Sequence, residues 1–342
     1  MIVLGIETSC DETAVGIVDD SGTILANIVL SQYSDHAEFG GVVPEIAARA
    51  HIDHIDTLIH QAIDTAGIAY ADIDGFAATC GPGLIGGVMV GMMAGKALAF
   101  THQKPFLAVN HLEGHALTPR LTNEAEFPYL LLLVSGGHSQ LLIAHDVGKY
   151  EQLGTTIDDA VGECFDKCAK MMGLPHPGGP NLEKLALEAS AVHKFDLPKP
   201  LLNRPGCDFS FSGLKTAVLR HIEAMPGETL PREQCADLAL AFQDTVAQIM
   251  QEKCARALDI YSETTSPKTP TLVVAGGVAA NKTLRQSLQD LCDEKNVQLK
   301  CPPIELCTDN GVMIAWAGLE KLSRNMLDTL DHPAKPRWPL NV

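Results

Sequence analysis

The chain has 342 residues, 46% of them hydrophobic, which is long and apolar enough for two domains with separate cores. It carries 25 basic and 42 acidic residues, a net charge of −17, which argues against nonspecific nucleic-acid binding by the chain as a whole. The ten cysteines are irregularly spaced and form no CxxC pair, a pattern typical of thiols in a reducing compartment rather than of a disulfide framework.

Residues 1–31 predict three strands, at 2–6, 14–18 and 23–29, joined by polar turns. Because the N-terminus has no basic region and becomes polar after Ile6, we expect a buried strand there and not a signal peptide. The apolar run that comes nearest to a membrane span, 86–100, is short and contains Lys96, so it predicts a buried helix. We therefore expect a cytoplasmic protein with no membrane partner.

Two histidines, His111 and His115, follow a short apolar strand at 105–109 and begin a predicted helix. Residues four apart share one helix face, so both imidazoles can hold one divalent metal. Another apolar strand is expected to end at Cys307, and Asp309 stands just before a predicted helix at 312–324. If the two segments face each other, Asp309 completes a ligand set with positions open for a substrate. Two unrelated histidines on a helix face are the alternative.

The pattern of residues 1–31 recurs at 129–156, and later strand–helix units recur as well. Ile6 aligns with Val134, and Thr79 with Ala275, so the second half carries about 68 extra residues between 156 and 271. We predict an α/β protein with one lobe at 1–128, a second at 129–342 containing an insertion at roughly 157–225, and a ligand cleft between them.

Three glycine-rich turns predict anion binding. The turn at 135–138 offers backbone N–H groups to a phosphate or carboxylate, and the turn at 177–180 opens a helix predicted at 181–190. In the third turn, at 276–281, Asn281 either caps a helix or binds the hydroxyls or base of a nucleotide. Together with Asp166 these turns indicate a nucleotide site. The chain has neither a Walker motif nor GxGxxG, which counts against P-loop and dinucleotide enzymes.

Basic and aromatic residues gather between 193 and 221, a composition that suits RNA binding by phosphate contacts and base stacking. They are Lys194, Lys199, Arg204, Lys215 and Arg220, with Phe195, Phe209 and Phe211. The tail adds Lys335, Arg337 and Trp338. A solvated loop over a core cluster is the alternative, and Lys215 could instead form a structural ion pair. For the pairs Cys164/Cys168 and Cys301/Cys307 we favour core packing over metal binding or redox response.

An ordered set of motifs along the whole chain resembles the bacterial TsaD family of tRNA N6-adenosine threonylcarbamoyltransferases, formerly described as O-sialoglycoprotein endopeptidases. The motifs occupy residues 5–13, 110–115, 134–138, 165–167, 177–180, 211–215, 276–281, 308–311 and 336–340. The resemblance implies an actin-like, sugar-kinase-like (ASKHA) duplicated two-lobed fold with a helical insertion in the second lobe. It also implies transfer of a threonylcarbamoyl group from threonylcarbamoyl-adenylate to N6 of the adenosine 3′ of the anticodon, in tRNAs reading codons that begin with A.

The same resemblance implies Fe2+ or Zn2+ on His111, His115 and Asp309. It implies that the adenylate is bound by Val134, Ser135, Gly136, Gly137, His138, Asp166, Gly179, Glu183 and Asn281, with Glu183 standing where many members have Asp. The implied partners are tRNA, a smaller paralogous (TsaB-like) subunit and a P-loop (TsaE-like) ATPase. Asp11 or Glu12 could orient the attacking amine or a water molecule, and Lys199, Arg204 and Lys215 are the candidate tRNA contacts.

Two other classes of function compete with this interpretation. A zinc protease of the HExxH type needs Glu directly after the first histidine, where this chain has Leu112, and Glu113 would point about 100° further round the helix. An actin-like small-molecule kinase, or a nucleotide-binding scaffold, would explain the glycine turns and the repeat. It would not explain the metal ligand set or the basic insertion.

Overall fold

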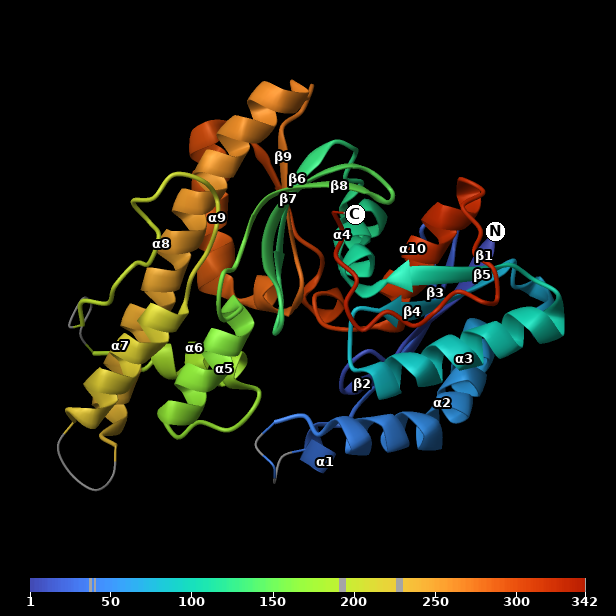
Figure 1. Ribbon diagram of the computed structural model, residues 1–342, viewed down its shortest axis with the longest axis horizontal. Coiled ribbons are helices and arrows are strands. Elements are labelled where there is room, and N and C mark those ends of the chain that lie inside the picture. The colour runs from blue at the N-terminus through green and yellow to red at the C-terminus, as the bar shows by residue number, and fades with distance from the viewer. Residues whose placement is uncertain (37–38, 40, 191–194, 226–229, 342) are drawn as a thin grey trace. The chain divides into compact units, whose positions relative to one another are not determined.

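The computed structural model describes residues 1–36, 39, 41–190, 195–225 and 230–341. The described chain forms two compact units (Figure 1). Unit 1 comprises Met1–Glu124, Val147–Lys149 and Thr308–Val342, and unit 2 comprises Ala125–Asp146 and Tyr150–Cys307. No helix in the described ranges combines the length and apolar character needed to cross a bilayer.

Unit 1 is built on a five-stranded sheet of order β3-β2-β1-β4-β5, in which β1, β2 and β3 are antiparallel and β4 and β5 run parallel to β1. The strands are β1 (Ile2–Glu7), β2 (Glu12–Asp19), β3 (Ile24–Ser31), β4 (Gly75–Gly81) and β5 (Phe106–Asn110). The helices are α1 (Tyr33–His36), α2 (Pro44–Ala66), α3 (Ile85–His102), α4 (His111–Asn123) and α10 (Gly311–Ser323), with the short η2 (Tyr70–Asp72).

Unit 2 repeats this arrangement with the order β8-β7-β6-β9-β10, where β6, β7 and β8 form the meander and β9 and β10 extend it in parallel. The strands are β6 (Tyr129–Val134), β7 (Ser139–Asp146), β8 (Lys149–Thr155), β9 (Thr271–Ala275) and β10 (Gln298–Lys300). The helices are α5 (Val161–Met171), α6 (Gly178–Ala186), α7 (Ser212–Glu223), α8 (Arg232–Thr265) and α9 (Lys282–Lys295), with η3 (Gly277–Ala280) and η4 (Ile304–Leu306). The matching strand orders confirm the duplication predicted from the sequence.

Helix α10 lies directly on the sheet of unit 1, and two glycines make this possible. A Cβ on Gly5 would lie 2.1 Å from the backbone N of Ala315, and one on Gly16 would lie 2.3 Å from that of Val312. Only glycine permits such a close approach of helix to strand. Residues 308–342 therefore belong to unit 1, which differs from the sequence-based boundary that assigned everything after 128 to the second lobe.

One predicted strand is wrong. We expected an apolar strand ending at Cys307, but β10 ends at Lys300 and the chain continues into η4. Pro302 and Pro303 explain the difference, because proline has no N–H to donate to a sheet ladder.

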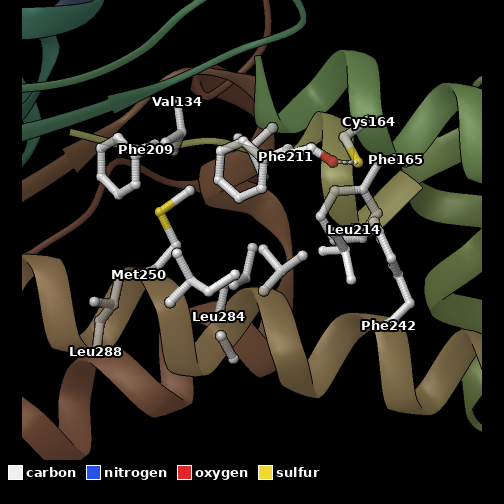
Figure 2. Close-up of a cluster of buried hydrophobic side chains, with 14 of the residues drawn as sticks. Val134, Cys164, Phe165, Phe209, Phe211, Leu214, Phe242, Met250, Leu284 and Leu288 are labelled. Atoms are coloured by element: carbon white, nitrogen blue, oxygen red, sulfur yellow. Dashed lines mark hydrogen bonds between the residues drawn. The ribbon is translucent and has the colours of Figure 1, made fainter. Parts of the chain in front are cut away.

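The core of unit 2 contains two of the aromatic residues that the sequence suggested for RNA stacking (Figure 2). Phe209 and Phe211 are fully buried, with ring centroids 6.0 Å apart, among residues such as Val134 and Leu214. Phe195 is partly buried against the same cluster. The stacking role is therefore excluded for Phe209 and Phe211, and the alternative of a loop over a core cluster is correct for them. His193 and Lys194 lie outside the described residues.

Candidate functional site

Three potential metal ligands converge in unit 1. The Nε2 atoms of His111 and His115 lie 3.5 and 3.1 Å from Oδ1 of Asp309, and all three ligand atoms fall within 4.8 Å of one another. The imidazole planes are nearly perpendicular, at 87°, so the two rings approach a common point from different directions. Both histidines are buried and Asp309 is half-buried. The structure therefore brings together the three residues that the sequence pattern named. All three lie in unit 1, whereas the sequence placed them in two different lobes.

The positions of the histidines follow from where α4 begins. Strand β5 ends at Asn110, whose side-chain oxygen accepts a hydrogen bond from the backbone N of Leu112 at 2.9 Å and so caps the helix. His111 and His115 then occupy the first turns of α4 on one face. Asp309 is fixed from the other side by the next residue, Asn310, which caps α10 by accepting from the N of Met313.

Glu7, at the end of β1, contacts a candidate metal ligand, and the sequence reasoning did not name it as a site residue. It is fully buried, and its Oε2 lies 3.0 Å from Nδ1 of His111. Its other oxygen accepts from the backbone N of Ser9, and the Thr79 hydroxyl donates to Oε2. A carboxylate on Nδ1 holds the proton there and leaves Nε2 as the lone-pair donor, as in many metal sites. The sequence feature that could have identified Glu7 is a glutamate at the end of an otherwise apolar, buried strand.

The charges around this cluster shift several pKa values. Burial disfavours the charged form of His111, but Asp309 and Glu7 outweigh it and raise its pKa to about 9. Burial opposes ionisation of Glu7 as well, yet the contact with His111 lowers the pKa of that carboxyl. For Glu12, the first residue of β2, burial and then the negative charges of Asp309 and Asp11 raise the pKa to about 9. Glu12 thus lies within electrostatic range of His111 and Asp309, and Asp11 lies beside Glu12.

The donor chemistry fits a divalent transition metal. Two imidazole nitrogens and one carboxylate oxygen form a set used by both iron(II) and zinc, and three protein ligands leave coordination positions for a substrate. The buried carboxylate behind His111 adds the outer support that such ligands usually have. The negative charge of Glu7 and Asp309 also favours a cation at this point.

The glycine turn at 135–138 lies in unit 2 between β6 and β7. The turn is closed by a hydrogen bond from the backbone N of Ser135 to the carbonyl of His138, at 2.8 Å, and the carbonyl of Gly136 accepts from the N of Glu163. A Cβ built on Gly136 or Gly137 meets no described atom within 4 Å. Packing within the chain therefore does not require glycine at these two positions. The close approach of a ligand to the backbone is a reason for having glycine there.

The remaining adenylate candidates also lie in unit 2, at or near the N-termini of α6 and α9 and on α5. Oδ1 of Asp166 accepts from the backbone N of Gly178 at 2.8 Å, which fixes the N-terminus of α6, and a Cβ on Gly179 would again meet no described atom. Glu183 accepts from the backbone N of Lys282 at 2.8 Å. Asn281 caps α9 through Oδ1 and donates through Nδ2 to Gln243, so both ends of its amide are engaged within the protein.

The candidate tRNA residues have different surroundings. Lys199 and Arg204 are exposed. The Lys215 ammonium donates to Asp159, which also accepts from Lys167, so Lys215 forms the structural ion pair that was the alternative for it. This contact favours the structural role for Lys215, and its assignment as a tRNA contact stays a prediction that we do not carry further. All ten cysteines are free, and Cys164 and Cys168 are fully buried in α5, as core packing predicts.

Comparison with known proteins gives consistent matches. The family described as "TsaD: tRNA N6-adenosine threonylcarbamoyltransferase" matches residues 23–316. A tRNA N6-adenosine threonylcarbamoyltransferase of Paramagnetospirillum magneticum is 56% identical over 341 residues, covering 100% of this chain and 97% of that protein. One of Methylocapsa acidiphila is 55% identical over 346 residues, covering 100% of this chain and 97% of that protein.

Among solved structures, HypF of T. kodakarensis is similar with a TM-score of 0.62 and 14% identity, over 94% of this chain and 48% of that one. The activator of 2-hydroxyisocaproyl-CoA dehydratase from Clostridium difficile, solved with bound ADPNP, has a TM-score of 0.53 and 14% identity, over 96% and 99% of the two chains. These likenesses concern the fold, and they confirm the actin-like duplicated α/β class expected from the sequence.

Proposed function

This chain belongs to the TsaD family of tRNA N6-adenosine threonylcarbamoyltransferases, and from that premise we propose that it transfers a threonylcarbamoyl group to tRNA. The donor is threonylcarbamoyl-adenylate, and the acceptor is N6 of the adenosine 3′ of the anticodon in tRNAs that read codons beginning with A. The observation that carries the proposal is the convergence of His111, His115 and Asp309 in a chain with this family membership.

We propose that these three side chains hold one Fe2+ or Zn2+ ion. An ion bound there supplies Lewis-acid polarisation of the acyl carbonyl. Glu7 keeps a proton on Nδ1 of His111, so that Nε2 presents its lone pair, and the Thr79 and Ser9 donors keep the Glu7 carboxylate in place. The protein thus sets the orientation of the ring, and a metal binding at Nε2 would displace the proton that the raised pKa of His111 keeps there at neutral pH.

The turn at 135–138 and the N-terminus of α6 are the proposed phosphate-binding groups for the adenylate. Gly137 and Gly179 leave room for an anion against the backbone N–H groups. Asp166 supports this by fixing the backbone of Gly178. Glu183 and Asn281 support it by holding the beginning of α9, since their hydrogen bonds are made to backbone there.

In the reaction that this assignment implies, N6 of the adenosine attacks the threonylcarbamoyl carbonyl carbon. The bond from that carbon to the phosphate oxygen breaks, N6 loses a proton, and AMP leaves with its phosphate held by backbone N–H groups. Asp11 and Glu12 are the proposed groups that orient the amine. The raised pKa of Glu12, caused first by burial, suits it to donating a hydrogen bond at neutral pH.

The proposed partners include a smaller paralogous subunit, for which unit 1 offers an apolar surface. Ile85, Met89 and Met93 repeat every fourth residue along α3 and are 46%, 49% and 54% exposed, and Phe100 on the same helix is 72% exposed. Contiguous apolar exposure of this kind marks interaction sites. We propose that the paralogous subunit covers this stripe, that a P-loop ATPase joins the complex, and that it acts on tRNA in the cytoplasm, with Lys199 and Arg204 among the tRNA contacts.

One reconstitution tests the function. The chain is incubated with the partner subunits, the adenylate-forming synthase, ATP, threonine, bicarbonate and unmodified tRNA, and the digested nucleosides are analysed. We expect N6-threonylcarbamoyladenosine with the parent chain and none with His115→Ala, which is matched in every other respect. Unmodified tRNA from a mixture whose synthase is shown to produce the adenylate would overturn the proposal. Phosphorylation of a small molecule in its place would favour the kinase alternative.

A further inference from the structure

The C-terminal segment of unit 1 runs along the ends of the strands that lead to the candidate metal centre (Figure 1, red trace). The backbone N of Lys335 donates to the carbonyl of Cys80, in β4, at 2.7 Å. The carbonyl of Pro336 accepts from the N of Gly83 at 3.2 Å. The carbonyl of Trp338 accepts from the side-chain amide of Asn110 at 2.9 Å. This last contact connects the segment to the residue directly before His111.

Asn110 is held at both ends of its amide group. Oδ1 accepts from the backbone N of Leu112 and caps α4, while Nδ2 donates to the carbonyl of Trp338. Because the amide is planar, a donor contact that fixes Nδ2 also fixes the direction of Oδ1. Asn110 is 3% exposed, so little water is available to replace either partner.

The segment is itself firmly anchored before it reaches Asn110. Oδ2 of Asp328 accepts from the backbone N of Ala108, in β5, and from the Lys321 ammonium, at 2.9 and 2.6 Å. The ammonium of Lys96 donates to the carbonyl of His332 at 2.6 Å. At the far end the Trp338 ring packs on the unit 1 core, with the Lys335 ammonium 4.5 Å from its centroid. The Trp338 carbonyl is therefore a fixed acceptor and not the end of a loose tail.

We propose that the C-terminal segment is a positioning element of the metal centre. The Trp338 carbonyl orients the Asn110 amide, the amide caps α4, and the cap sets the first turn of the helix on which His111 and His115 stand. Asn110 is thus a positioning residue that contacts neither metal nor substrate. This inference rests on the proposed metal centre, and it predicts that Zn2+ affinity depends on a contact made by residues more than 220 positions away in the sequence.

The primary test is Asn110→Asp, measured as Zn2+ affinity by competition with a chelator. Aspartate is as good a helix cap as asparagine, and its charge would by itself favour a nearby cation. It cannot donate to the Trp338 carbonyl. If the cap alone mattered, Zn2+ affinity would stay the same or rise. We expect it to fall about tenfold, the lower end of the range for groups that support metal ligands. An unchanged or higher affinity overturns the proposal.

A C-terminal truncation, made both in the parent chain and in the Asn110→Asp chain, completes the test. A chain ending at Arg337 lacks the Trp338 carbonyl, and a chain ending at Leu340 keeps it and serves as the matched control. We expect the shorter chain to bind Zn2+ about tenfold more weakly than the control when Asn110 is present, and no more weakly in the Asn110→Asp chain, because the contact is already lost there. Equal losses in both backgrounds would contradict the inference, since the segment would then act by another route.

Thermal unfolding of each metal-free chain shows whether it is folded. Should the shorter chain fail to fold, the full-length Asn110→Asp comparison still decides the question. Failure of the metal centre itself has a different signature, in which the full-length parent binds Zn2+ no better than Asp309→Ala.

Discussion

The two candidate sites are built from different parts of the polypeptide. In unit 1 the site consists of side chains, where Glu7 contacts His111 and both histidines approach Asp309. In unit 2 it consists of backbone at glycine turns and helix N-termini, with side chains such as Asp166 only supporting it. A side-chain site is specified by residue type and spacing. A backbone site depends on which glycines are needed by a ligand and which by the fold.

The largest effect should come from removing a metal ligand. We expect Asp309→Ala and His111→Ala to weaken metal binding by roughly a hundredfold or more, since even supporting groups are worth about 10–100-fold. Measurement is by metal content after gel filtration and by chelator competition. The fold should survive in Asp309→Ala, because Asp309 is only half-buried, whereas His111→Ala should also lose stability, because it removes the histidine partner of the buried Glu7 carboxylate. Full metal content in Asp309→Ala would show that the side-chain site is something else.

The next effect concerns the glycine turns, where Gly179 can be substituted to test ligand binding and its neighbour Gly178 serves as the control. Gly137→Val and Gly179→Val should leave the fold intact, because no described atom lies within 4 Å of the added Cβ. Both should lower affinity for a non-hydrolysable adenylate by about tenfold or more, as expected for losing a backbone hydrogen bond to a charged group. Calorimetric titration measures this.

The control for the glycine experiment is Gly178→Ala. Its Cβ would lie 2.6 Å from Cα of Asp166, so this variant should lose thermal stability instead of showing a selective loss of ligand. If Gly137→Val bound the adenylate normally, the turn at 135–138 would have no role in binding the ligand. Unit 2 would then not contain the backbone site that we contrast with the side-chain site of unit 1.

The sequence predicted the side-chain site better than its surroundings. The four-residue spacing of His111 and His115, and the aspartate before a helix, follow from local patterns. Glu7 was missed because its partner lies 104 positions away, and such a contact exists only once β1 and α4 are packed in one unit. The unit boundary was wrong for the same reason. Long-range contacts bring residues 308–342 back to the first sheet, among them the close approach of α10 to Gly5 and Gly16.

In unit 2 the sequence could not distinguish glycines of equal appearance. Gly276 has φ +93°, and its Cβ would lie 2.4 Å from the carbonyl of Val134, so the fold requires it. Gly137 has no such neighbour. The basic insertion was ambiguous for a related reason. Composition alone does not show whether Phe209 and Phe211 are buried in the core or lie on the surface, where they could stack on RNA bases.

A smaller effect should follow from reversing exposed charges in unit 2. Lys199→Glu with Arg204→Glu should weaken tRNA binding several-fold and flatten its salt dependence, because phosphate contacts release counterions. The loop should remain folded, since the Arg204 carbonyl accepts from Lys253 at 3.4 Å through the backbone. The control reverses two other exposed lysines with the same change in charge, Lys149 of unit 1 and Lys268 of unit 2. Equal losses from both pairs would mean that only net charge matters and that Lys199 and Arg204 are not specific contacts.

The smallest effect concerns stability, through the buried His51 of α2. Its Nε2 lies 3.1 Å from the carbonyl of Cys10, and its Nδ1 lies 2.8 Å from the Thr13 hydroxyl, so the neutral ring supports the turn that carries Asp11 and Glu12. Burial lowers its pKa below the usual 6.5, against the opposing effect of the Glu7 and Asp11 carboxylates.

Below pH 6.5 the unfolded chain therefore binds a proton that the folded chain does not, and the free energy of unfolding falls as the pH falls, by at most about 1.4 kcal/mol per pH unit for this group. Denaturant titrations of the metal-free chain between pH 7 and pH 5 measure the slope. His51→Gln should be less stable at pH 7 but show a smaller further loss at pH 5 than the parent. An identical slope in the two chains would mean that His51 binds protons equally well in the folded and unfolded states, so that burial does not lower its pKa.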